Sequence, residues 1–140
     1  MEFKKFANTY VLRLDKGEEI VETLKKFCKE EGISLGWVKG IGAANRAVIG
    51  LLNTKDKKYT TRELLGDHEI VSLVGNISNM DGEVYLHLHI ALANEDYITY
   101  GGHLDSAIIG ATGEIIIETI DGDVGRSFSQ EIGLNLMDFD

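Results

Sequence analysis

Proline is absent from this chain of 140 residues, and cysteine occurs only once. The lack of proline excludes polyproline ligand motifs and rigid proline-rich spacers. A single cysteine cannot form an internal disulfide, which favours an intracellular, cytoplasmic location. The sequence has no run of the roughly 18 apolar residues that a membrane-spanning helix needs. Residues 1–6 also lack the apolar core of a signal peptide. We therefore expect no association with a membrane.

Basic residues are scarce as well. Lys and Arg together number 14 against 23 Asp and Glu, which gives a formal net charge of −9. Because affinity for nucleic acid comes largely from cations that displace counterions from phosphates, the chain has no overall attraction to DNA. The densest basic stretch is residues 55–58, and it is compatible with a local patch or with a solvated hairpin tip. The length and a hydrophobic content of 44% predict a single domain over residues 1–140.

One segment near the N-terminus carries apolar residues at helical spacing. The pattern predicts one long helix that begins near Asp15, where an acidic cap is followed three residues later by Glu18. Gly32 is a suitable end for this helix. Cys28 falls in the apolar stripe and is interpreted as a small buried hydrophobe rather than a reactive thiol. The stripe consists of Ile20, Val21, Leu24, Phe27 and Cys28.

Most of the remaining chain is typical of β-strands. Asp81-Gly82 between two apolar runs is a strong hairpin signal, and it predicts that residues 69–79 pair with residues 84–93. Residues 103–110 are ambiguous, and a short helix or an irregular turn is expected there. One helix and many strands predict an α+β fold with a central, mainly antiparallel β-sheet. Strands are expected at residues 8–14, 35–41, 46–53, 57–65, 69–79, 84–93, 113–120 and 125–130.

Three of the four histidines lie between positions 87 and 103. His87 and His89 alternate with leucines in a predicted strand, so their side chains share one face. His103 follows Gly101-Gly102, where the backbone can approach another segment closely. Two adjacent imidazoles and a third nearby predict a metal site formed by His87, His89 and His103. The alternative is that they are half-buried strand residues, hydrogen-bonded at a subunit contact, that bind no metal.

Three neutral imidazoles suit zinc best, with nickel, copper or iron as alternatives. Three protein ligands leave the fourth tetrahedral position to water or a substrate, whereas closed structural zinc sites normally have four protein ligands. An open site of this kind can lower the pKa of bound water to about 7 and generate hydroxide for a hydrolase or lyase. Glu69, Asp96 and Asp105 are the nearest carboxylates, but no spacing singles one out as an acid or base. Catalytic residues therefore remain unassigned, and enzymatic activity remains open.

Other motifs are weaker. Residues 40–45, Gly-Ile-Gly-Ala-Ala-Asn, lack the third glycine of a dinucleotide fingerprint and precede a predicted strand, so we expect a tight turn there. A cupin would carry a carboxylate three or four residues beyond its second histidine, and Glu95 lies farther than that from His89. Ser127 and Ser129 lack the Gly-x-Ser-x-Gly setting of a serine hydrolase. His68 stands apart from the other histidines and is predicted to be a surface or subunit-contact residue.

Five short segments follow one another in an order that resembles a known family. They are Gly40-Ile41-Gly42-Ala43 ahead of Arg46, Glu69-Ile70-Val71-Ser72-Leu73, Leu86-His87-Leu88-His89, Tyr100-Gly101-Gly102-His103-Leu104 and Gly113-Glu114-Ile115-Ile116-Ile117. This order is similar to that of the plants-and-prokaryotes-conserved (PPC) domain, over nearly the whole chain. The two histidine segments are the most specific part. The resemblance implies an α+β fold, a homotrimer, and zinc held by the histidines that match His87, His89 and His103.

The resemblance also implies a candidate DNA-binding or regulatory role, of the stand-alone prokaryotic type. An AT-hook, whose core contains proline, cannot occur in this sequence. The plant interaction motif Gly-Arg-Phe-Glu-Ile-Leu aligns with residues 66–71, where Asp67-His68 replaces Arg-Phe, so plant-type partners are not implied. Three functions follow: a homotrimeric zinc module that acts on DNA or in regulation, a zinc-dependent enzyme or small-molecule sensor, and a trimeric scaffold without metal.

Overall fold

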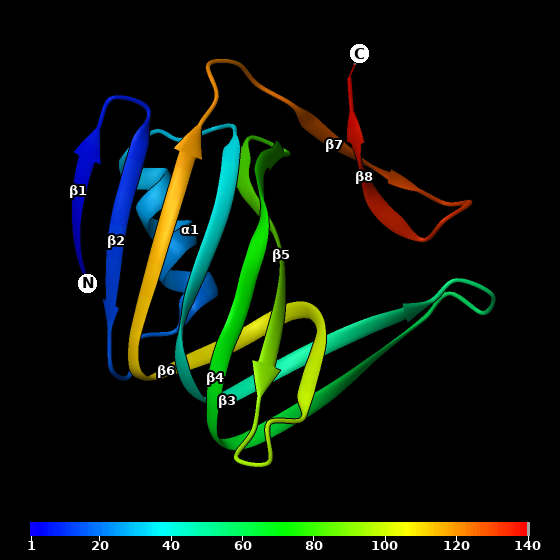
Figure 1. Ribbon diagram of the computed structural model, residues 1–140. Coiled ribbons are helices and arrows are strands. Elements are labelled where there is room, and N and C mark those ends of the chain that lie inside the picture. The colour runs from blue at the N-terminus through cyan, green and yellow to red at the C-terminus, as the bar shows by residue number, and fades with distance from the viewer. Residues whose placement is uncertain (140) are drawn as a thin grey trace.

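The computed structural model describes residues 1–139, and its main feature is one six-stranded, wholly antiparallel sheet in the order β1-β2-β6-β3-β4-β5 (Figure 1). A two-stranded hairpin of β7 and β8 follows it. No helix in this part of the chain has the length and apolar character needed to cross a membrane. The elements are β1 (Glu2–Phe6), β2 (Thr9–Asp15), α1 (Ile20–Glu30), β3 (Gly36–Asn53), β4 (Lys58–Met80), β5 (Glu83–Ala93), β6 (Thr99–Thr119), β7 (Gly125–Ser129) and β8 (Leu134–Asp138).

The sheet closes on itself because β6 changes neighbours along its length. Its C-terminal half pairs with β2 and β3, whereas residues 99–103 pair with β5. Register shifts in β3 fall between Gly40 and Gly42 and between Ala44 and Arg46. Bulges of this kind bend a strand and increase its twist. Beyond the bend, β3 still pairs with β6 as far as Gly50, which lies opposite His103. The last residues of β3 and the first residues of β4 then extend away from the sheet as a two-stranded arm (Figure 1).

The hairpin predicted at Asp81-Gly82 is confirmed. Both residues have positive φ angles, 53° and 78°, as the tight turn between two antiparallel strands requires. The ladder runs from Met80 opposite Glu83 to Glu69 opposite Ala93. This register places His87 opposite Asn76 and His89 opposite Val74.

Helix α1 packs against one face of the sheet and supplies the centre of the core (Figure 1). Phe27 meets the ring of Tyr10 edge to face at 5.3 Å between centroids. Cys28 is fully buried, and burial raises the pKa of its thiol to about 12, as expected of a structural cysteine. Other side chains buried between helix and sheet are Leu12, Leu14, Ile20, Leu24, Ile115 and Ile117.

The prediction of a long helix that begins near Asp15 is wrong. Asp15 is the last residue of β2, and the backbone then turns through Gly17, whose φ is +90°. Glu19 is the true cap: its carboxylate accepts from the backbone N–H of Glu22 at 2.6 Å and from that of Ala107 at 2.9 Å. The hydrogen bond between Glu19 and Ala107 holds the start of the helix against β6. The helix therefore begins at Ile20 and has 11 residues.

Two further differences concern the strands. Residues 103–110 form neither a helix nor an irregular turn but continue β6, because β3 pairs with this stretch and Leu104, Ala107 and Ile109 are buried. The separate strands expected at 35–41 and 46–53 are one strand, β3, and those at 57–65 and 69–79 are one strand, β4. Strands β1 and β8 have no counterpart among the predicted ones.

Candidate metal centre

The three histidines predicted to form a metal site converge on one side of the β5–β6 ladder. His89 lies directly opposite His103, and His87 is two residues away on the same face of β5. The ring centroids are 5.2 Å apart for His87 with His89 and with His103, and 5.6 Å apart for His89 with His103. Within residues 1–139, this is the one group of three His, Cys, Asp or Glu side chains whose ligand atoms all lie within 4.8 Å of one another.

The donor set and its spacing fit a zinc ion. A tetrahedral ion with Zn–N bonds near 2.0 Å needs about 3.3 Å between its ligand nitrogens. Small side-chain rotations would close separations of up to 4.8 Å to that value. All three ligands come from one chain and from two adjacent strands, so the sheet fixes their relative positions.

The surroundings of His87 and His103 favour the neutral form of these two imidazoles. Burial, followed by the nearby charges of His103, Arg126 and His89, lowers the pKa of His87 to about 4. Burial also lowers the pKa of His103, although the carboxylate of Asp105 opposes this shift. Neutral imidazole is the form that ligates metals. His87 and His103 are therefore in the form that ligates a metal at neutral pH.

Tyr59 and Asp105 form a pair beside His103. The Tyr59 hydroxyl donates to Oδ1 of Asp105 at 2.9 Å, and the tyrosine ring meets the His103 ring edge-on at 6.3 Å. Burial and this hydrogen bond raise the pKa of Tyr59 to about 12, so the hydroxyl stays protonated. Gly50 makes the arrangement possible, because a Cβ there would lie 1.7 Å from the Tyr59 oxygen.

Of the three carboxylates considered as acids or bases, only Asp105 touches a residue of the site. Glu69 and Asp96 do not line the cavity that contains the histidines. Asp105 does not line this cavity itself but accepts a hydrogen bond from Tyr59, which does. The sequence did not single out Tyr59. The pairing of β3 with β4 and β6 decides this contact, and no local spacing indicates it.

A cavity of about 780 Å³ opens over the three histidines. Residues of the β3–β4 arm and of the β7–β8 hairpin line this cavity. The arm and the hairpin extend on the same side of the molecule (Figure 1). The arm contributes Leu51 and Leu52, and the hairpin contributes Leu134, Leu136 and Met137. A metal on the histidines would therefore have space on its open side for a ligand.

Arg126 is a second residue of the cavity wall that sequence reasoning missed. It is the only Lys or Arg after Arg62, and this isolation is the signal that could have found it. From β7 its guanidinium donates to Ser78 Oγ at 2.7 Å, to Asn76 Oδ1 at 2.8 Å and to the Asn135 carbonyl at 2.8 Å. The group also lies 4.6 Å from the ring centroid of Tyr85.

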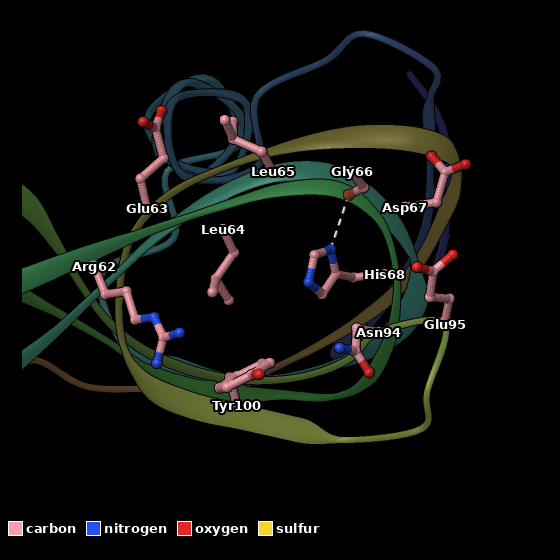
Figure 2. Close-up of a pocket in the computed structure, with 10 residues that line it drawn as sticks. All are labelled: Arg62, Glu63, Leu64, Leu65, Gly66, Asp67, His68, Asn94, Glu95 and Tyr100. Carbon is pink, nitrogen blue, oxygen red and sulfur yellow. Dashed lines mark hydrogen bonds between the residues drawn. The ribbon is translucent and has the colours of Figure 1, made fainter.

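His68 lies apart from the three clustered histidines, in a separate cavity of about 530 Å³ (Figure 2). Its side chain is only 9% exposed, and Nδ1 is 2.8 Å from the carbonyl of Gly66. Figure 2 shows His68 and Leu64 directed into the enclosed space. The prediction of a surface position is therefore wrong: residues 64, 68 and 70 are all buried on the inner face of β4.

Solved structures resemble this fold over almost the whole chain. A candidate DNA-binding protein of Bacteroides thetaiotaomicron is 40% identical, with a TM-score of 0.96 over 99% of this chain and 96% of that one. A plant- and prokaryote-conserved (PPC) protein of Pyrococcus horikoshii is 33% identical, with a TM-score of 0.86 over 99% and 94%. A metal-containing protein of Archaeoglobus fulgidus is also 33% identical, with a TM-score of 0.86 over 98% of each chain.

Comparison of sequences also finds a curated relative and a matching family. The bifunctional protein GlmU of a Synechococcus strain is 32% identical over 110 residues, or 77% of this chain. The matched part spans only 16% of that curated relative. The family model of the Plants and Prokaryotes Conserved (PCC) domain matches residues 1–121, which include all three clustered histidines. The chain therefore belongs to the Plants and Prokaryotes Conserved domain family, as its sequence resemblance implied.

Proposed function

We propose that this protein binds one zinc ion through His87, His89 and His103 and presents the fourth coordination position to a small molecule. The observation that carries the proposal is that three imidazoles, with ligand atoms within 4.8 Å of one another, line one cavity. The 33% identity to a metal-containing protein supports the binding of a metal. Zinc is favoured because three histidines with one free position are typical of its open sites.

The resulting activity is that of a zinc-dependent enzyme or a small-molecule sensor. When bound, zinc supplies a Lewis acid that polarises an oxygen or activates water. The protein contributes Tyr59, whose protonated hydroxyl is held by Asp105, and the cation of Arg126. These groups can orient an oxygen-bearing ligand next to the histidines. In a sensor, these contacts would select the ligand. In an enzyme, they would align the ligand for reaction.

The module is proposed to act as a homotrimer. The sheet face opposite α1 exposes large apolar side chains around a shallow groove of about 390 Å³. Among them, Ile41 is 57% exposed and Val71 is 54% exposed. Grouped apolar side chains on a surface are typical of protein contacts. Val11 and Val74 belong to the same groove, so a second copy of the chain is a suitable occupant.

Metal content and assembly test these proposals together. Freshly purified protein is expected to carry about one zinc per chain by elemental mass spectrometry. Removal of zinc with a chelator is expected to leave the trimer intact in analytical ultracentrifugation, because all three ligands come from one chain. No metal, even after incubation with zinc, contradicts the metal proposal. Dissociation on chelation would mean that the ion joins subunits, and it would overturn the open site.

Direct DNA binding is the second candidate, and the 40% identity to a candidate DNA-binding protein favours it. The net charge of −9 on each chain opposes it, since binding to phosphates depends on cations. We expect no gel shift of duplex DNA at micromolar protein, even at low salt, where electrostatic binding is strongest. A shift under those conditions would instead support DNA binding, with the lysines of residues 55–58 at the arm tip as the first to be substituted.

A further inference from the structure

Arg126 is an uncompensated cation in the wall of the histidine cavity. It forms none of the ion pairs found within residues 1–139, and it is partly buried. A buried charge is costly unless a partner of opposite charge meets it. Burial lowers the pKa of Arg126, as desolvation of a cation without an anion does. An anionic ligand that contacts the guanidinium would therefore offset the cost of this burial.

The guanidinium is held rigidly and still has free donors. Asn76, Ser78 and the carbonyl of Asn135 each accept one N–H. Arginine has five N–H donors, so each terminal nitrogen retains one for a further acceptor. Two oxygens on one group, as in a carboxylate, suit such a pair of donors. The guanidinium also lies over the ring of Tyr85, with 4.6 Å between Cζ and the ring centroid, and this contact further restricts its movement.

The register of the sheet places this cation next to the metal ligands. Asn76, which accepts from Arg126, lies directly opposite His87 in the β4–β5 ladder. Tyr85 is two residues before His87, on the same face of β5. Residues two apart in a strand are about 7 Å apart along it. One small molecule can therefore reach both the guanidinium and an ion on the histidines.

The composition of the cavity wall favours an anion with an apolar part. Among residues 1–139, none of those that line the cavity is an Asp or Glu, although the chain contains 23 acidic residues. A bound zinc ion adds positive charge to a wall that already contains Arg126. The apolar side chains that line the cavity are those of Leu51, Leu52, Leu134, Leu136 and Met137.

From these observations we infer that the cavity binds a small aliphatic carboxylic acid, whose carboxylate is held by Arg126 while a second oxygen, a hydroxyl or oxo group, meets the metal. This inference rests on the proposed zinc site and names the ligand class for it. Arg126 acts here as a recognition residue, and the leucines and methionine of the wall cover the aliphatic chain.

The test uses zinc-loaded protein, isothermal titration calorimetry and two matched probes, 2-hydroxyisovalerate and its neutral amide. The acid is expected to bind at least about tenfold more tightly than the amide, because only the acid offers the guanidinium a full negative charge and two equivalent acceptor oxygens. In Arg126→Gln the acid is expected to lose that advantage, whereas Arg126→Lys retains part of it. The metal content of both variants is expected to equal that of the wild type. Cobalt-substituted protein should show a change in its visible spectrum when the acid binds.

The possible outcomes distinguish a failure of the proposed zinc site from a failure of the carboxylate inference. If the wild type holds no metal, the proposed zinc site has failed. If metal is present but acid and amide bind equally, or neither binds, the carboxylate inference is wrong, and this comparison needs no variant. If Arg126→Gln changes the assembly state and leaves acid binding unchanged, the anion partner of Arg126 is a side chain of another subunit, which also overturns the inference.

Discussion

Replacing His87 or His103 by alanine is expected to remove nearly all bound metal. Each variant deletes one of three ligands, and loss of an outer-shell partner alone weakens metal sites by about 10- to 100-fold. Loss of a direct ligand is therefore expected to cost more than about 100-fold in affinity. Elemental mass spectrometry of desalted protein, and competition with a chromogenic chelator, measure the effect. His89→Ala is expected to behave in the same way, since His89 faces His103 across the ladder.

His68→Ala is the matched control for these variants. His68 is a histidine of the same sheet, but it lies in the second cavity with Gly66 as its hydrogen-bond partner. Its substitution is expected to leave the metal content unchanged, although it removes a buried side chain. Thermal unfolding of all four variants checks that each is folded. Wild-type metal content in both His87→Ala and His103→Ala would refute the site.

Gly75→Ala is expected to destabilise the protein by about 3 kcal/mol or more. A Cβ on Gly75 would lie 2.0 Å from the carbonyl oxygen of His87 and 2.8 Å from Cα of Leu88. These are backbone atoms and cannot rotate away, so β4 and β5 must separate where β5 carries the histidines. Chemical denaturation monitored by circular dichroism measures the free energy of unfolding. Metal affinity is expected to fall as well, because the spacing of His87 and His103 depends on this ladder.

Gly125→Ala is the control for that substitution. Gly125 also lies in a strand, but nothing lies within 4 Å of the position that its Cβ would take. Its free energy of unfolding is expected to stay within about 0.5 kcal/mol of the wild type. Equal free energies of unfolding for the two alanine variants would contradict a close approach of β4 and β5 at Gly75.

The helix start shows where local signals mislead. Asp15 and Glu18 have the spacing of a capping box, and Glu18 does accept the backbone N–H of Asp15 at 2.7 Å. That hydrogen bond closes a turn at the end of β2, and the helix begins only after Glu19. Glu19 is the cap because its carboxylate also accepts from Ala107 on β6, a contact that its neighbours in the sequence do not indicate.

The sequence by itself determined the two features that follow from short-range geometry. Alternation along a strand places His87 and His89 on one face, since side chains repeat every second residue. The Asp81-Gly82 turn determines the pairing of β4 with β5, because both residues readily adopt positive φ angles. The order of five segments along the chain indicated the family.

Only the tertiary structure decided how distant segments meet around the histidines. His103 lies opposite His89 because β6 pairs with β5 at one end and with β2 at the other. Tyr59 and Arg126 reach the same cavity from the β3–β4 arm and from β7. Such contacts depend on the register of several strands at once, and that register is set by the burial of the whole core. Periodicity and turn residues encode neighbours along a strand, whereas closure of the sheet is a property of all its strands together.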